Sequence, residues 1–358
     1  MMMPGASHSI DVSAAASPAP LTTQGALDPL WLGKALAPLT GGAPIESVDV
    51  VETIRTTATK IRFRARWAGG EAALCLKAFV DMDKGAGGGA TSLTETDFYL
   101  LLARELGVRV PECVAGIADR DGDQGIIIMR DLIEEGATFC SALDPFTLDD
   151  AADSLSQIAR LHAGTGRMDR VPNLSRRIAD LAAWKIVSPS ELQALLDGPR
   201  GRELDPRTRD AERLVAAFEA LARADAALPA TLLHGDCHAG NVYRTADGLG
   251  LVDWQLLQRG NWALDVAYHI CAVLPVERAV AGEWDLLDHY LETARGLGVA
   301  VPGRAEARAH YRAATVYGYY LWAITRRVDP AITEVFVDRL GKAVERHDGF
   351  DAVDMRSG

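Results

Sequence analysis

The sequence lacks an excess of basic residues and has no long hydrophobic runs. Its 37 lysine and arginine residues are outnumbered by 49 aspartate and glutamate residues, so the net charge is −12. General binding to nucleic acid or to anionic membranes needs concentrated basic surface, and this balance argues against both partners. No stretch approaches eighteen uninterrupted apolar residues. We therefore expect no membrane-spanning helix.

Cysteine is also scarce, and no two cysteines form a C-x-x-C pair. The five that occur are widely spaced: Cys75, Cys113, Cys140, Cys237 and Cys271. An odd, scattered set of this kind predicts reduced thiols in a cytoplasmic protein.

Apolar material is plentiful, and its pattern changes along the chain. Hydrophobic residues make up 48% of the 358 residues, which is enough for a sizeable core. Residues 1–27 are rich in Ala, Ser, Pro and Thr and lack the features of a secretory signal, so we expect a disordered tail there. Farther on, the pattern is mainly that of amphipathic helices. Before them come five runs typical of short strands: residues 48–54, 61–67, 72–79, 113–117 and 125–129.

The densest group of polar residues lies in one short stretch. His234 to Asn241 reads H-G-D-C-H-A-G-N, and Asp253 follows twelve residues later in a short apolar run. The apolar flanks predict a tight loop between short strands. Asp236 is suited to accept a proton, whereas Asn241 and Asp253 offer the oxygen atoms that Mg²⁺ prefers when it shares its coordination with phosphates. The implied chemistry is phosphoryl transfer.

The layout H-x-D-x-x-x-x-N followed by a strand-borne Asp is that of kinases. In detail it resembles the aminoglycoside phosphotransferase and choline kinase-like family, whose loop reads H-G-D-x-H-x-x-N and whose metal-binding strand ends in D-W. The resemblance implies an α+β, two-lobed protein-kinase-like fold. Residues 28–131 would form a small N-terminal lobe with a five-stranded antiparallel sheet and a helix, and residues 132–358 a larger, mainly helical lobe. It also implies that His234, His238 and Asp265 support the loop.

A lysine in the expected third strand has a candidate partner in the following helix. Lys77 lies in an apolar strand pattern, where an unpaired ammonium would be costly if buried. Glu95, eighteen residues later, lies in a segment with helical spacing. A strand Lys paired with a helix Glu is how kinases orient the lysine toward the α- and β-phosphates. We predict both as nucleotide-binding residues, with Asp97 and Glu105 as alternative partners.

Two further nucleotide contacts follow from the resemblance. The first turn of the strand meander covers the phosphates in this family and often bears glycine, but residues 56–60 contain none. The hydroxyl groups of Thr57 and Thr59 are candidate replacements, and an exposed polar turn is the alternative. One segment is similar to the family's hinge, where backbone groups bind the adenine edge: Met129, Arg130, Asp131 and Leu132.

These features predict an ATP-dependent O-phosphotransferase, a small-molecule kinase that uses Mg²⁺ to move the γ-phosphate to the hydroxyl of a small alcohol. GTP is an alternative nucleotide, and neither the alcohol nor the oligomeric state has a readable signature. Protein-kinase activity is disfavoured because no A-P-E-like element follows Asp253. Two other functions stay open. One is a catalytically silent nucleotide-binding protein with a kinase-like fold, and the other a zinc hydrolase with His234, Asp236 and His238 as ligands.

Overall fold

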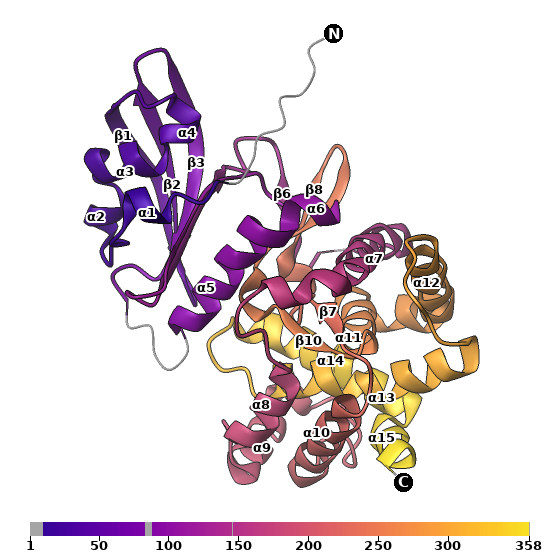
Figure 1. The fold of residues 1–358 in the computed structure, drawn as a ribbon. Helices are drawn as coiled ribbons and strands as arrows, with labels where there is room; N and C mark the ends of the chain where they lie inside the picture. The colour runs from indigo at the N-terminus through magenta and orange to yellow at the C-terminus, as the bar shows by residue number, and fades with distance from the viewer. Residues whose placement is uncertain (1–9, 83–87, 145, 358) are drawn as a thin grey trace. The chain divides into compact units, whose positions relative to one another are not determined.

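The computed structural model describes residues 10–82, 88–144 and 146–357. The chain divides into two compact units. The first contains the chain up to residue 138 together with residues 169–172 and 252–257, and the second contains the remainder. Figure 1 shows that the first unit is built around a sheet and that the second is mainly helical.

The sheet of the first unit has five strands in the order β1-β2-β3-β5-β4, and all neighbours are antiparallel. The strands are β1 (Ile45–Arg55), β2 (Thr59–Trp67), β3 (Gly70–Ala78), β4 (Cys113–Asp119) and β5 (Gln124–Arg130). In β2 the apolar residues Ile61, Phe63 and Ala65 are fully buried and alternate with arginines. This alternation is what predicts a half-buried strand, and the predicted five-stranded sheet is confirmed.

Four short helices cover one face of the sheet (Figure 1). They are α1 (Ser13–Ala16), α2 (Thr23–Ala26), α3 (Pro29–Ala35) and α4 (Ala37–Thr40). Ala16, Ala26 and Leu32 belong to the same buried cluster as Phe63 and Leu74. Small side chains allow these helices to approach the strands closely. The segment that contains the four helices is therefore part of the core and is not a tail.

Residues 10–12 also pair with the outer strand β4. The Val12 N–H donates to the Gly116 carbonyl at 3.1 Å, and the Gly116 N–H donates to the Ile10 carbonyl at 3.0 Å. The prediction of a disordered tail is therefore wrong for residues 10–27, because an alanine-rich composition does not reveal a fitted apolar surface. Residues 1–9 lie outside the described part of the chain.

The helix α5 (Gly88–Phe98) packs on β5 and continues through a π-helical turn (Tyr99–Ala103) into α6 (Arg104–Leu106). The closest approach is at Gly125, where a Cβ atom would overlap the Ser92 carbonyl. The Gly125 N–H donates to Ser92 Oγ at 2.9 Å, which fixes this contact. The absence of a side chain at Gly125 thus sets the position of the helix that carries Glu95.

The second unit is mainly helical. Its α-helices are α7 (Leu148–Ala163), α8 (Arg177–Trp184), α9 (Pro189–Leu196), α10 (Ala211–Ala226), α11 (Ala263–Val273), α12 (Val276–Gly296), α13 (Arg304–Ala323), α14 (Pro330–His347) and α15 (Gly349–Ser357). β7 (Thr231–Leu233) pairs with β10 (Gln258–Gly260), and β8 (Val242–Thr245) pairs with β9 (Gly248–Leu251) and borders β6 (Thr138–Phe139). Within the described residues, no helix is long and apolar enough to cross a membrane.

A buried carboxylate joins three of these helices. Glu283 of α12 accepts hydrogen bonds from Arg346 Nη2 at 2.7 Å and from His347 Nε2 at 3.0 Å on α14, and from the Tyr311 hydroxyl of α13 at 3.4 Å. Burial alone would raise the pKa of Glu283, but the bonds from His347 and Arg346 outweigh it and lower the pKa below its usual value. The hydrogen-bonded carboxylate of Glu283 thus fixes the positions of the three helices relative to one another.

The close approach at Gly125 leads to the first prediction. Gly125→Ala should lower the free energy of unfolding by about 1–3 kcal/mol, because the added methyl group must displace the backbone of α5. The matched control is Gly33→Ala in α3, where an added Cβ meets nothing within 4 Å. This control should be neutral or slightly stabilising. Denaturant titration of both variants checks the prediction, and equal stabilities would contradict it.

Candidate active site

The loop His234 to Asn241 connects β7 to β8 and ends in a 3₁₀ turn, Ala239–Asn241. Gly235 has φ 83°, a left-handed conformation that favours glycine. The His238 ring accepts a hydrogen bond from the Gly240 N–H at 3.0 Å and so caps the turn. The sequence predicts a tight loop between short strands, and the structure has one.

The backbone of the loop is anchored on Asp265, the third residue of α11. Its buried carboxylate accepts hydrogen bonds from the N–H groups of His234, at 2.7 Å, and Gly235, at 2.9 Å. His162 Nε2 lies 3.2 Å from the same carboxylate. Burial would raise the pKa of Asp265, but the hydrogen bond and charge of His162 lead the contributions that lower it below its usual value. Asp265 therefore stays ionised and keeps accepting these bonds.

The carboxylate of Asp236 has a polar partner on each oxygen. The Tyr268 hydroxyl donates to Oδ1 at 3.0 Å, and Asn241 Nδ2 lies 3.2 Å from Oδ2. His238 Nε2 lies 3.6 Å from Oδ2. His234 is fully buried, and its Nδ1 accepts a hydrogen bond from the Asp236 N–H at 3.2 Å. The loop thus gathers Asp236, Asn241 and both histidines at one place within the second unit.

The side chain of Asn241 has a defined orientation. Its amide nitrogen donates to the Asp236 carbonyl at 2.8 Å, so the amide oxygen is the atom turned away from that carbonyl. An oxygen ligand is what a Mg²⁺ ion requires. Among the described residues, no group of three or more His, Cys, Asp or Glu side chains is placed to hold a metal ion by itself. The structure therefore does not support a zinc site formed by His234, Asp236 and His238 alone.

The first unit contains the other predicted group. Lys77 of β3 is buried, and its Nζ lies 2.8 Å from Glu95 Oε2 and 3.0 Å from Asp253 Oδ1. Burial lowers the pKa of Lys77, but the charges of Asp253 and Glu95 outweigh it and raise the pKa to about 12. One ammonium group therefore faces two carboxylates. The alternative partners lie elsewhere: Asp97 pairs with Arg120, and Glu105 pairs with Arg170.

The backbone at Asp253 is held in an unusual conformation by the residue after it. Asp253 has φ 67°, a region that an L residue other than glycine rarely adopts. The Trp254 ring stacks on Phe98 of α5, with ring centroids 3.7 Å apart and planes 12° apart. The Trp254 N–H also donates to Glu95 Oε1 at 3.1 Å. These contacts place Asp253 with Lys77 and Glu95 in the first unit.

Most of the hinge-like segment already has backbone partners. The Arg130 N–H donates to the Glu112 carbonyl, the Asp131 N–H donates to the Ala73 carbonyl, and the Leu132 carbonyl accepts from Ala137 N–H. Met129 pairs with Cys75 in the sheet. The Asp131 carboxylate binds Arg62 Nε at 2.9 Å. Any contact with adenine must therefore use a backbone group that does not take part in these bonds. Sequence alone does not show which groups those are.

The two threonines of the first turn differ. Thr57 is exposed at the turn between β1 and β2. Thr59 is fully buried, and its hydroxyl donates to the Val80 carbonyl at 2.9 Å. The predicted phosphate contact of Thr59 is therefore not what the structure shows, because its hydroxyl holds the end of β3 instead. A partner twenty-one residues away in the sequence gives no local signal.

The sequence does not predict the buried side chains that pack against the loop. Tyr268 binds Asp236 directly, and Trp322 Nε1 donates to the Tyr268 hydroxyl at 2.7 Å. The Tyr317 hydroxyl donates to the Gly235 carbonyl at 2.8 Å. His269 Nδ1 lies 2.6 Å from the Cys237 carbonyl, and its Nε2 lies 2.7 Å from Ser154 Oγ. Aromatic residues at helical spacing are usually core, and no motif marks these for the loop.

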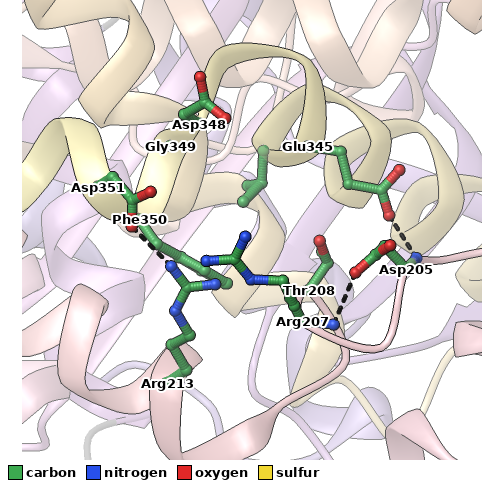
Figure 2. A pocket seen from close by; sticks show the side chains of 10 residues that line it. Asp205, Arg207, Thr208, Arg213, Glu345, Asp348, Gly349, Phe350 and Asp351 are labelled. Atoms are coloured by element: carbon green, nitrogen blue, oxygen red, sulfur yellow. Dashed lines mark hydrogen bonds and ion pairs between the residues drawn. The ribbon is translucent and has the colours of Figure 1, made fainter.

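The described residues of the second unit line hollows, two of which differ in character. One, of about 250 Å³, is lined by charged residues that pair with one another, including Arg213 with Asp351 at 2.6 Å and the Asp205 N–H with Glu345 at 2.6 Å (Figure 2). The other, of about 370 Å³, is more apolar and is lined in part by Val215, Phe218 and Tyr320. The Phe218 and Tyr320 rings stack with centroids 3.8 Å apart. Its size suits a small organic molecule.

The fold and the family profile assign the chain to the class of kinase-like phosphotransferases. The chain belongs to the phosphotransferase enzyme family, because the profile of that family matches residues 88–342, well over half of the 358 residues. This confirms the family that the loop motif suggests. None of the curated proteins compared with the chain matches it.

Several solved structures are similar to this chain, and the first one described below has the same fold. A choline kinase from Cryptosporidium parvum Iowa II is 11% identical, with a TM-score of 0.53 over 86% of this chain and 90% of that one. A choline/ethanolamine kinase family protein from Mesorhizobium loti is 19% identical, with a TM-score of 0.48 over 90% and 98% of the two chains. An aminoglycoside-3'-phosphotransferase of type VIII is 24% identical, with a TM-score of 0.43 over 79% and 97%.

The buried histidine behind the loop leads to the second prediction. Burial lowers the pKa of His269 to about 4, whereas histidine in an unfolded chain titrates near ~6.5. Between these values the unfolded chain binds a proton that the folded protein does not, so the free energy of unfolding falls as the pH drops from ~6.5 to ~4, by at most about 3 kcal/mol. In His269→Gln this part of the pH dependence should vanish. Denaturant titrations at several pH values check it, and an unchanged pH dependence would contradict it.

Proposed function

We propose that this protein is an ATP-dependent phosphotransferase that moves the γ-phosphate to a hydroxyl group of a small molecule. The observation that carries the proposal is the pairing of buried Lys77 with Glu95 and Asp253. A helix glutamate and a strand lysine of this kind orient phosphates in kinases. The loop with Asp236 and Asn241 supplies the rest of the expected machinery, and membership of the phosphotransferase enzyme family supports the same conclusion.

The nucleotide end of the proposed site uses the first unit. Lys77 would neutralise charge on the α- and β-phosphates, and Glu95 would hold the ammonium in place. The adenine edge would meet the segment from Met129 to Leu132, and we assign the Leu132 N–H as its donor because neighbouring backbone groups are already bonded. Thr57, which is exposed at the first turn, would offer its hydroxyl group to the phosphates. GTP in place of ATP would use the same phosphate contacts.

The residues present fit a magnesium ion. Asp253 offers carboxylate oxygens beside Lys77, and Asn241 turns its amide oxygen away from the Asp236 carbonyl. Hard oxygen donors are what this ion selects. We propose Asp253 and Asn241 as its ligands. When bound, the ion would neutralise charge on the β- and γ-phosphates.

Asp236 is the proposed general base. It would accept the proton of the acceptor hydroxyl as the oxygen attacks the γ-phosphorus, while the oxygen between the β- and γ-phosphates leaves with ADP. Positioning and charge stabilisation dominate this reaction, so the role of the loop is to hold Asp236 still. His234, His238 and Asp265 support the loop through the bonds described above and do not take part in the proton transfer.

We propose that the apolar hollow of the second unit binds the body of the acceptor, away from its reacting hydroxyl group. Its Phe218 ring stacks on Tyr320 and also lies parallel to Tyr317, with centroids 6.5 Å apart. Tyr317 in turn binds the Gly235 carbonyl, next to Asp236. The buried Phe218 and Tyr317 rings therefore lie between the hollow and the loop, so an acceptor must extend beyond the hollow for its hydroxyl group to reach Asp236. The acceptor class that suits it has an apolar body and a primary or secondary hydroxyl.

The reaction would take place in the cytoplasm, where ATP is available. The five cysteines are free thiols in the structure, which agrees with a reducing compartment. A catalytically silent nucleotide-binding protein is the second candidate function. It would keep the Lys77 cluster but would consume no nucleotide when an alcohol is added.

The third prediction tests the reaction. Screening a library of small alcohols for ADP or GDP release should identify an acceptor-dependent turnover. Asp236→Ala should reduce this turnover by about two orders of magnitude or more, because the base is lost. Asp247→Ala, at an exposed turn between β8 and β9, is the matched control and should retain activity. Turnover of Asp236→Ala within a few-fold of wild type would refute the assignment.

A metal analysis separates this function from that of a zinc hydrolase. Zinc that stays bound after mild chelation would favour the hydrolase.

The fourth prediction tests the acceptor hollow. Val215→Trp should fill the space and raise the KM for the acceptor at least about tenfold, without changing the KM for the nucleotide. Ala216→Trp, the exposed neighbour on the same helix, is the control. Steady-state kinetics with the acceptor from the screen provide the measurement. An acceptor KM equal in the two variants would place the acceptor elsewhere.

A further inference from the structure

The direction of the hydrogen bonds around Tyr268 is fixed by chemistry. The Trp322 Nε1–H, 2.7 Å from the Tyr268 oxygen, can only donate. The phenol oxygen therefore accepts from Trp322, and its own proton points to Asp236 Oδ1 at 3.0 Å. A chain of two donors thus ends on the carboxylate. Because the indole fixes the phenol, the phenol restrains rotation of the carboxylate.

The surrounding helices are shaped to hold this chain. Tyr268 is almost fully buried in α11, and Trp322 is buried in α13. Gly318, inside α13, leaves room for the Tyr268 ring, since a Cβ there would collide with it. Glycine inside a helix is destabilising, so its presence indicates that the close approach matters. Burial, then the charge of Asp236, raises the pKa of Tyr268 well above its ordinary value, and the hydroxyl keeps its proton.

We propose that Tyr268, oriented by Trp322, is a positioning residue that fixes the Asp236 carboxylate for proton abstraction. The inference rests on the proposed function of Asp236 as general base. Tyr268 does not touch the substrate in this proposal. It acts only by holding Asp236 Oδ1, so that the carboxylate presents one orientation to the acceptor.

The test compares two buried tyrosines whose hydroxyl groups each donate one hydrogen bond, and Tyr268 also accepts one from Trp322. Tyr268→Phe should lower kcat by about 10- to 100-fold, with the nucleotide KM close to that of the control. Its melting temperature should fall further than that of the control, because the Trp322 N–H also loses its acceptor. The control is Tyr319→Phe, whose buried hydroxyl donates to the Thr208 carbonyl at 3.0 Å. Trp322→Phe should lower kcat less, and adding it to Tyr268→Phe should cause little further loss, because both act through one chain.

The outcomes separate this inference from the proposed function. If Asp236→Ala is inactive while Tyr268→Phe matches Tyr319→Phe, the positioning role is overturned and the base assignment stands. If Asp236→Ala is active, the proposed function itself fails. Crystal structures of wild type and Tyr268→Phe need no acceptor. The inference requires one Asp236 rotamer bonded to Tyr268 in wild type and a changed or disordered carboxylate in the variant, and an unchanged carboxylate overturns it.

Discussion

The loop from His234 to Asn241 depends on one buried carboxylate, that of Asp265. Two consecutive backbone N–H groups converge on it, and the side chain of His162 lies against the same group. A carboxylate without water must find such donors, because an uncompensated buried charge costs several kcal/mol or more. The loop therefore adopts the backbone conformation in which both N–H groups reach the Asp265 carboxylate. The same residue that braces the loop also determines where Asp236 can lie within the second unit.

A similar constraint operates around Lys77. Its buried ammonium requires partners, and Glu95 and Asp253 provide them from two distant segments of the chain. Buried ion pairs of this kind add little net stability and chiefly specify one arrangement. Here the arrangement includes a left-handed backbone at Asp253, which the stacked ring of Trp254 keeps in place. Conformational strain of this type persists only where packing over-determines it.

The sequence predicted the elements whose signals are local. Alternation in residues such as Ile61 and Phe63 predicted the sheet, and the spacing of polar residues predicted the loop, because period and motif are properties of neighbouring positions. Contacts between distant segments were not predictable in the same way. The bond from Thr59 to Val80 and the chain from Trp322 to Asp236 follow from how elements pack. The sequence does not predict that Ala16 lies in the core, because alanine is common both in tails and in protein interiors.

The pairing of residues 10–12 with β4 has a consequence for handling the protein. β4 is one of the two edge strands of its sheet, and such strands present unpaired backbone groups that attract strands of other molecules. The bonds between Gly116 and the N-terminal segment occupy this border. A shortened chain that began at residue 28 would uncover both the border and the apolar surface beneath α1 and α2. Intermolecular β-pairing and loss of solubility would then compete with folding.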